Sequence, residues 1–163
     1  MPNHSTPQKA AFISGASYGI GQASALALAK DGFDIVVSDL DSKSLLTTLE
    51  KLQEFPIKAL ALSLDITQQN SIDNAFSEAF TYFPHLNTLV NNAGVPSLRT
   101  LAIETSRSAW DSVINTNLTG TFFMSTSFAK HLIAKKLSGR ILQIASTHGL
   151  VGFQGASAYG ISK

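Results

Sequence analysis

The chain of 163 residues contains no cysteine, so it can form neither a disulfide nor a thiolate metal site. Its four histidines lie too far apart in the sequence to act as a ligand pair, and we expect no metal site. Long apolar runs are also lacking, because polar residues interrupt each hydrophobic stretch before it reaches the length that a bilayer requires. These absences exclude disulfide-rich and membrane-spanning proteins.

Charge is scarce as well: 14% of the residues are charged, the net charge is +1, and the twelve Lys and Arg residues are scattered. Without a basic cluster there is no field to attract a phosphate backbone, so we expect no nucleic-acid partner. The N-terminus (MPNHSTPQKAAF) has neither a signal-peptide nor a transit-peptide pattern, which predicts a cytoplasmic protein with a short tail over residues 1–8. Residues 9–163 form the single expected domain, which is long enough to bury roughly 70% of its unfolded surface.

Short apolar runs alternate with longer segments of helical pattern. The runs that predict buried strands are residues 9–14, 34–39, 58–64, 88–90 and 140–145. The segments that predict helices are residues 20–30, 42–53, 68–83 and 107–136, with a short last helix that reaches residue 163. Strands that are apolar on both faces are typical of a parallel sheet covered by helices on each side. The pattern therefore predicts a Rossmann-type, doubly wound α/β domain with three α/β/α layers.

The first turn from strand to helix reads SGASYGIG, with glycines at positions 15, 19 and 21. Glycine allows a sharp turn, lets a pyrophosphate approach the main chain, and lets the helix pack closely on the strand. The N–H groups and the positive end of the helix then face the anion. Glycines placed for steric reasons alone are the alternative, but the position after the first strand favours nucleotide binding.

Asp39 ends the second predicted strand, about 18 residues beyond the last glycine of the turn. A carboxylate there can accept hydrogen bonds from both ribose hydroxyls and would repel a 2′-phosphate, which favours NAD over NADP. Tyr18, inside the glycine turn, supplies no positive charge for such a phosphate. The neighbouring Asp41 leaves an alternative, in which the two acids only cap the following helix.

Several motifs together resemble the classical short-chain dehydrogenase/reductases in their order and spacing. They are SGASYGIG at 14–21, LDIT at 64–67, NNAG at 91–94, NTNLTG at 115–120, IAS at 144–146 and YGISK at 159–163. The resemblance covers the chain from about residue 9 onward. It implies an NAD(P)-dependent oxidoreductase that interconverts a secondary alcohol and a ketone by hydride transfer.

The resemblance implies a catalytic role for Asn117, Ser146, Tyr159 and Lys163. The tyrosine would exchange a proton with the substrate oxygen, the serine would fix that oxygen, and the asparagine would hold a water that links the lysine to solvent. The lysine would bind the nicotinamide ribose and lower the tyrosine pKa. Independent chemistry agrees, since phenol has a pKa near 10 and needs a nearby positive charge to act as a base at neutral pH. A buried Asn117 that only caps a neighbouring loop is the alternative.

The same resemblance implies a set of cofactor-binding residues. In it, Asp65 would meet the adenine amino group, and the NNAG segment would line the floor of the site. For Asn92 the alternative is a side chain that only braces the sheet, and this alternative is stronger than the one for Asn117. The implied set is Gly15, Ser17, Tyr18, Gly19, Ile20, Gly21, Asp39, Leu40, Asp65, Ile66, Asn92, Ala93, Gly94, Tyr159 and Lys163.

The substrate is less defined. Besides Ser146 and Tyr159, the segment after the serine offers His148, Phe153 and Gln154 as substrate contacts, although a loop histidine in solvent is the alternative for His148. The phrase IASTHGLV is similar to that of D-3-hydroxybutyrate dehydrogenases. Pro96 and Ala156 stand where those enzymes have a Gln and a Lys that hold the substrate carboxylate, so hydroxy- or oxo-acyl, acetoin-like and sugar-alcohol substrates all stay open.

The chain is shorter than the family's usual length, so we expect the C-terminal strands of the fold to be missing from this sequence. The strand at 140–145 would then be an apolar edge, and the helix that carries Tyr159 and Lys163 would be short. The resemblance also implies a full-length homo-oligomer, a dimer or tetramer, formed through the helix at 107–136 and the helix that carries Tyr159. Two hypotheses follow: part of an NAD-dependent dehydrogenase, or an inactive dinucleotide-binding module.

Overall fold

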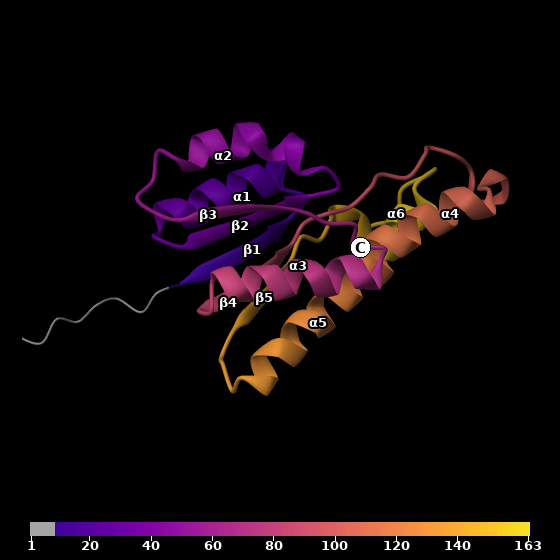
Figure 1. Cartoon of the computed structure of the whole chain (residues 1–163). Coiled ribbons are helices and arrows are strands. Elements are labelled where there is room, and N and C mark those ends of the chain that lie inside the picture. The colour runs from indigo at the N-terminus through magenta and orange to yellow at the C-terminus, as the bar shows by residue number, and fades with distance from the viewer. Residues whose placement is uncertain (1–8) are drawn as a thin grey trace, which may run out of the picture.

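Five parallel strands form one sheet in the computed structural model, which describes residues 9–163; the expected tail lies outside the described residues. The strand order is β3-β2-β1-β4-β5, and each pair is parallel (Figure 1). The strands are β1 (Ala10–Ser14), β2 (Asp34–Asp39), β3 (Ala59–Ser63), β4 (Leu86–Asn91) and β5 (Arg140–Gln143). The order runs outward from β1 in one direction and then from β4 in the other, so the predicted doubly wound sheet is confirmed.

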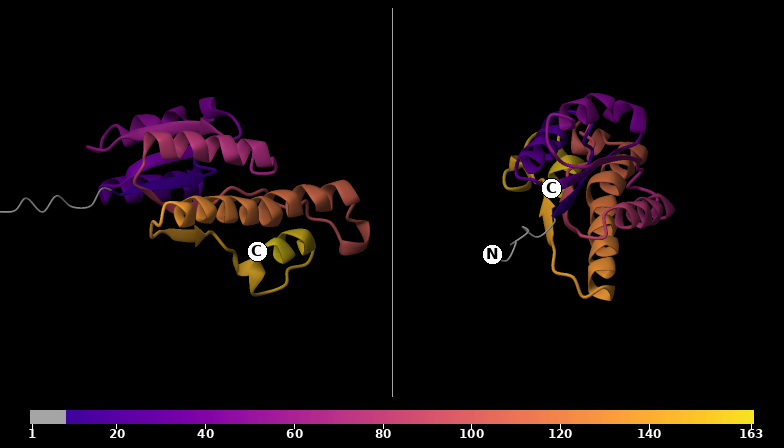
Figure 2. Two further views of the ribbon diagram at one scale, coloured as in Figure 1. Left: turned by 60° about the horizontal axis from the view of Figure 1, so that its bottom comes forward. Right: turned by 60° about the vertical axis from the view of Figure 1, so that its left-hand side comes forward.

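Helices cover both faces of this sheet, with α1 and α2 on one side and α3 and α5 on the other (Figures 1 and 2). Their bounds are α1 (Gly19–Lys30), α2 (Leu46–Leu52), α3 (Gln69–Tyr82), α4 (Arg107–Ile114), α5 (Thr121–Ala134) and α6 (Ser157–Ser162). Short 3₁₀ turns are η1 (Ser42–Leu45), η2 (Ala102–Glu104) and η4 (Thr147–Gly149), and η3 (Asn115–Gly120) is a π-helix. The three-layer α/β/α architecture is therefore as predicted.

Alternating side chains of β1 supply two separate cores. Ala10 and Phe12 pack on the side of α3 and α5, whereas Ala11 and Ile13 pack on the side of α1 and α2, and all four are fully buried. Phe12 lies 5.1 Å from the ring of Phe76 in the first of these cores. Successive strand residues point to opposite faces, so burial of every residue fixes β1 as a central strand.

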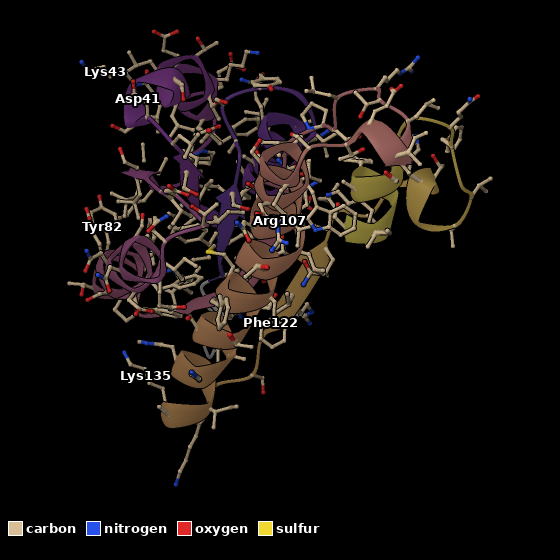
Figure 3. The ribbon with its side chains drawn as sticks, turned by 90° about the vertical axis from the view of Figure 1, so that its right-hand side faces the viewer. Asp41, Lys43, Tyr82, Arg107, Phe122 and Lys135 are labelled. Atoms are coloured by element: carbon tan, nitrogen blue, oxygen red, sulfur yellow. The ribbon has the colours of Figure 1, made fainter. Side chains whose placement is uncertain are left out.

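The predicted helical region 107–136 is continuous but changes its winding, because η3 joins α4 to α5 as a π-helix. The segment predicted as helix 42–53 starts with η1, where the carboxylate of Asp41 accepts a hydrogen bond from the N–H of Lys43 at 2.9 Å (Asp41 and Lys43 are labelled in Figure 3). Asp41 is thus a helix cap, as one of the two interpretations expected. β4 begins earlier than predicted, and β5 ends earlier.

The last strand, β5, lies at the edge of the sheet, and all four of its residues are exposed. Ile141 and Leu142 are 39% and 46% exposed, so the predicted apolar edge is present in this structure. Among residues 9–163, no helix is long and apolar enough to cross a membrane.

Candidate active site

A cavity of about 660 Å³ opens at the carboxyl ends of the central strands, where the strand order reverses between β1 and β4. Open α/β sheets bind ligands at this position because the loops after neighbouring strands diverge there. Most of the predicted cofactor residues lie on its wall: Gly15, Tyr18, Gly19, Ile20, Asp39, Leu40, Asp65, Ile66, Asn92, Ala93 and Gly94.

The three glycines of the first turn are required for different reasons. Gly15 has φ +66°, and a Cβ there would lie 2.8 Å from the Cα of Ala93. A Cβ on Gly21 would collide with the carbonyl oxygen of Gly15, whereas Gly19 has φ +61° and open space around it. The N-cap of α1, Tyr18, makes no capping hydrogen bond with its side chain. The first N–H groups of α1 are therefore available at the cavity for an anionic group.

Asn92 braces the glycine turn from β4. Its Nδ2 donates to the carbonyl oxygens of Ser14 at 3.0 Å and Gly15 at 2.8 Å, while the Ser14 hydroxyl accepts from the N–H groups of Asn92 and Ala93, both at 3.1 Å. The bracing role that was weighed for Asn92 is therefore present, even though the residue also lies on the cavity wall.

The carboxylate of Asp39, at the end of β2, is held by the glycine turn. Its Oδ2 accepts from the hydroxyl of Ser17 and from the N–H of Ser17 at 3.3 Å, and its Oδ1 accepts from the N–H of Leu40 at 2.9 Å. Ser17 is not on the cavity wall, and its side chain is bonded to Asp39. These bonds leave lone pairs of the carboxylate free toward the cavity.

Asp65 is fixed in a similar way beyond the end of β3, the strand that pairs with β2. Its Oδ1 accepts from the N–H of Thr67 at 2.9 Å and from the Thr67 hydroxyl at 2.7 Å, and its own N–H donates to the hydroxyl of Ser71 at 3.0 Å. Two ordered carboxylates, Asp39 and Asp65, thus lie on the same cavity.

Asn117 lies in the π-helix and is only 3% exposed. Its Oδ1 accepts from the N–H of Val95 at 2.8 Å, and its Nδ2 donates to the carbonyl oxygen of Val95 at 2.9 Å and to the hydroxyl of Ser162 at 3.1 Å. The amide therefore clamps the loop after NNAG and also contacts α6, which satisfies its buried polar atoms.

Lys163 lies at the same contact between α6 and the loop after NNAG. Its Nζ donates to the carbonyl oxygen of Ile144 at 3.1 Å and lies 5.8 Å from the centre of the Tyr159 ring. Burial lowers the pKa of Lys163 below its ordinary value. A Cβ built on Gly94 would lie 3.1 Å from Asn117 Oδ1 and 3.6 Å from Lys163 Nζ, so Gly94 joins the cavity wall to both residues.

The segment after β5 packs against α6. The hydroxyl of Ser146 accepts from the N–H of His148 at 3.2 Å and so caps η4. The His148 ring stacks on Phe153, with 4.1 Å between ring centres, and meets the Tyr159 ring edge-on at 5.3 Å. Ser146, His148 and Tyr159 are thereby brought to one place, whereas Gln154 lies exposed on the loop.

Several cavity residues were not among the predicted ones. They are Ser14, Ser38, Leu64, Thr67, Val95, Ser112 and Thr116. Four of them, Ser14, Leu64, Thr67 and Thr116, lie inside the sequence motifs. Ser38 and Val95 are direct neighbours of predicted cofactor residues, and that position could have indicated them. Ser112 lies in α4, and Thr116 lies in the following π-helix, inside the NTNLTG motif. The two residues are one helical turn apart, and only this spacing could have indicated that both face the cavity. Four predicted cofactor residues, Ser17, Gly21, Tyr159 and Lys163, lie outside its wall.

A parallel doubly wound sheet with a glycine turn and a cavity at its switch point defines a Rossmann-type domain. The model of the short chain dehydrogenase family matches residues 9–163, and the chain therefore belongs to that family. The family membership that the sequence motifs predict is therefore confirmed.

Individual relatives agree with this assignment. The chain is 37% identical over 147 residues to the 2-dehydro-3-deoxy-D-gluconate 5-dehydrogenase of Escherichia coli, covering 90% of this chain and 56% of that enzyme. It superimposes on NAD⁺-bound xylitol dehydrogenase with a TM-score of 0.92 at 26% identity, covering 97% of this chain and 61% of the other. For the F189W actinorhodin polyketide ketoreductase with NADPH, the TM-score is 0.89 at 31% identity, covering 95% and 59%. The chain thus spans less than two thirds of the length of these proteins.

Proposed function

We propose that this chain forms the cofactor-binding and proton-transferring part of an NAD(P)-dependent oxidoreductase that interconverts a secondary alcohol and a ketone. The observation that carries the proposal is the junction at Gly94, where the wall of the cavity meets Asn117 and Lys163. A nucleotide that enters along the glycine turn would end beside the residues proposed to handle the proton.

The residues fit a dinucleotide by their chemistry. The uncapped start of α1 offers N–H groups to a pyrophosphate, and Asp39 and Asp65 offer ordered acceptors for hydroxyl and amino groups. Tyr18 and Leu40 line the same cavity although they are 80% and 71% exposed. Exposed apolar surface of this kind at a cavity is typical of a binding site, and an adenosine would cover it.

When bound at this site, a nicotinamide cofactor would supply the hydride acceptor or donor of the proposed reaction. Tyr159 Oη accepts the hydroxyl proton when an alcohol is oxidised and returns it when a ketone is reduced. The Lys163 ammonium, with Nζ 5.8 Å from the centre of the Tyr159 ring, supplies a positive charge beside the tyrosinate that forms. The Ser146 hydroxyl orients the substrate oxygen, and Asn117 holds the Val95 loop and α6 together around these groups.

Asp39 favours NAD in this proposal. The 2′-phosphate of NADP would lie close to the Asp39 carboxylate, which already accepts hydrogen bonds from Ser17 and Leu40. Because the phosphate and the carboxylate are both negatively charged, they would repel each other. We expect Asp39→Ser to weaken NAD binding about tenfold and to shift the ratio of NAD to NADP affinity toward NADP, as measured by calorimetric titration of both nucleotides. A ratio that does not change would assign no discriminating role to Asp39.

The substrate contacts in this proposal come from His148, Phe153 and Gln154, on the segment that packs beside Tyr159. The relatives act on sugar-derived and polyketide compounds according to their names, and their range is compatible with a hydroxy- or oxo-acyl, acetoin-like or sugar-alcohol substrate. We also propose a homo-oligomer, because Leu118, Phe122 and Phe123 form an exposed apolar surface on η3 and α5, with Phe122 59% exposed (Figure 3).

A dinucleotide-binding module without turnover is the second candidate. It is favoured by one observation: the Ser146 hydroxyl caps η4 and Lys163 Nζ donates to the Ile144 carbonyl oxygen, so among residues 9–163 neither group is bonded to the Tyr159 hydroxyl. Groups that are not positioned on the reacting oxygen would give little catalysis.

The experiment that separates the two candidates incubates the purified chain with NAD and a panel of secondary alcohols and follows the formation of reduced nicotinamide. We expect Tyr159→Phe to lower turnover about 10²- to 10⁴-fold, because it removes the acid–base hydroxyl, and to leave NAD affinity unchanged. Turnover that survives in Tyr159→Phe would contradict the catalytic assignment. NAD binding without turnover in the full-length protein that contains this chain would favour the binding module.

A further inference from the structure

Thr48 is a fully buried polar residue in α2 that neither the motifs nor the cavity wall includes. Its hydroxyl donates to the carbonyl oxygen of Ala16 at 2.8 Å and accepts from Nε2 of Gln22, also at 2.8 Å. The hydroxyl therefore connects α1 and α2 to the glycine turn. A buried hydroxyl with both a donor and an acceptor partner is fully used, so its orientation is fixed.

Lys51 sets the direction of this connection. Its Nζ can only donate, and it does so to Oε1 of Gln22 at 2.8 Å. The amide group of Gln22 must then present its Nε2 to Thr48 and to the carbonyl oxygen of Ser17, which lies 3.2 Å away. Thr48 in turn directs its single proton to the glycine turn, with the carbonyl oxygen of Ala16 at 2.8 Å and that of Ser17 at 3.3 Å. We call Lys51, Gln22 and Thr48 the Thr48 relay.

The relay holds two carbonyl oxygens of the glycine turn, those of Ala16 and Ser17, on the side of α2. The N–H of Ala16 is held as well, by the carbonyl oxygen of Ser38 at 3.0 Å, and Ser17 donates to Asp39. A carbonyl oxygen that faced the cavity would repel a phosphate, because both carry negative charge. Turning these carbonyls toward α2 leaves the cavity to the N–H groups at the start of α1.

We propose that the Thr48 relay positions the glycine turn for the pyrophosphate of a dinucleotide, with Thr48 as the central positioning residue. The inference rests on the proposed nucleotide site and goes beyond it, since it assigns a role to residues on the outer side of the turn. Thr48 touches no ligand in this proposal, and it acts through Ala16 and Ser17. Its loss should therefore weaken ligands that carry a pyrophosphate more than ligands that lack one.

The test compares ADP, NAD and adenosine as ligands of the whole chain, with calorimetry for the first two and NMR shift titration for adenosine. Thr48→Val keeps the shape and removes the hydroxyl. We expect it to weaken ADP and NAD five- to twentyfold and adenosine less than twofold. Thr48→Ser retains the hydroxyl and should stay within twofold of the unaltered chain for all three ligands.

Thr88→Val is the matched control. Thr88 lies in β4 and is 3% exposed, and the substitution removes a comparable buried hydroxyl, whose partner among residues 9–163 is Oδ1 of the neighbouring Asn87 at 3.2 Å. It should bind all three ligands as the unaltered chain does. Lys51→Met, at an exposed side chain, serves if Thr48→Val does not fold, and it should weaken ADP two- to threefold by freeing the Gln22 amide.

Each outcome decides the proposal. A Thr48→Val chain that binds ADP within twofold of the unaltered chain overturns it, and so does an equal loss for adenosine and ADP, which would indicate general damage to the fold. If Thr48→Val does not fold, Lys51→Met is tested in its place, and unchanged ADP binding by Lys51→Met then overturns the proposal. If the unaltered chain binds neither ADP nor NAD, the nucleotide site itself is wrong, and the relay is overturned together with it.

Discussion

The proposed site has a nucleotide end at the glycine turn and a reacting end at Tyr159 and Lys163, and the two ends are held by different kinds of structure. Around the glycine turn, three polar residues are buried and hydrogen-bonded: Ser14 is 2% exposed, and Ser38 and Thr48 are 0% exposed. At the reacting end, all residues of β5 are exposed, and α6 has six residues. The nucleotide end thus rests on the central strands β1, β2 and β4, whereas the reacting end rests on the edge of the sheet (Figure 2).

This difference shows where the order of the proposed site originates. Catalysis needs the reacting groups to be positioned before the substrate arrives. The glycine turn gains that order from the core strands, while Tyr159 gains it from contacts made across loops. Asn117 is the residue that connects the two ends, since it bonds Val95 beside the cavity and Ser162 in α6.

The largest effect is expected where the buried end is broken. Gly21→Ala places a Cβ against the carbonyl oxygen of Gly15, so the turn must shift; we expect a loss of about 1–3 kcal/mol in the free energy of unfolding and at least tenfold weaker NAD binding. Gly19→Ala is the matched variant, because its Cβ meets nothing within 4 Å and its positive φ alone costs about 1–2 kcal/mol. Urea unfolding and calorimetric titration measure both effects. Equal loss of NAD affinity in the two variants would contradict the close-packing role of Gly21.

A second, more selective effect is expected at the connection between the ends. Asn117→Ala leaves the N–H and carbonyl of Val95 without their side-chain partner, which should cost about 1–3 kcal/mol in urea unfolding. Asn115→Ala, at an exposed position of the same π-helix, should change the unfolding free energy by less than about 0.5 kcal/mol. ADP binding should survive in both variants, because the glycine turn is intact. If ADP binding fails in Asn117→Ala, the two ends are less independent than this comparison holds.

Much of the buried end could be predicted from the sequence, because its signals are local. The apolar runs predict β1 and β2, and the glycine spacing predicts the turn between β1 and α1. Such local patterns do not predict which distant segment a side chain will contact. The bond of Ser17 to Asp39 and the bond of Thr48 to Ala16 join different elements, so neither could be predicted without the fold.

Sequence patterns were also less informative at the reacting end. The run RILQIA predicts a strand over 140–145, but β5 ends at Gln143, since Ile144 and Ala145 already lead into the loop that brings Ser146 to α6. Likewise, helical periodicity over 107–136 predicts one helix and gives no sign of the π-helix, which arises where Asn117 is turned inward to bond Val95.

The smallest effect is expected from the titration of Lys163. Burial lowers the pKa of this lysine in the folded chain, whereas in the unfolded chain it returns to 10.5. Between the two values the unfolded chain binds more protons, so the stability of the folded chain rises with pH in that window and the burial penalty is fully present below it. The change is modest because the side chain is only partly buried.

Urea unfolding between pH 8 and 10.5 tests this sign on the unaltered chain and on Lys163→Met, with Lys58→Met as the variant at an exposed lysine. Relative to Lys163→Met, the unaltered chain should gain stability as the pH rises, while its difference from Lys58→Met should change less. The opposite slope would mean that the ammonium gains more from the Ile144 carbonyl and the Tyr159 ring than it loses by burial. In that case polar contacts would stabilise the Lys163 ammonium at the reacting end, just as hydrogen bonds fix the carbonyl groups of the glycine turn. The two ends would then differ in burial but not in how well their polar groups are stabilised.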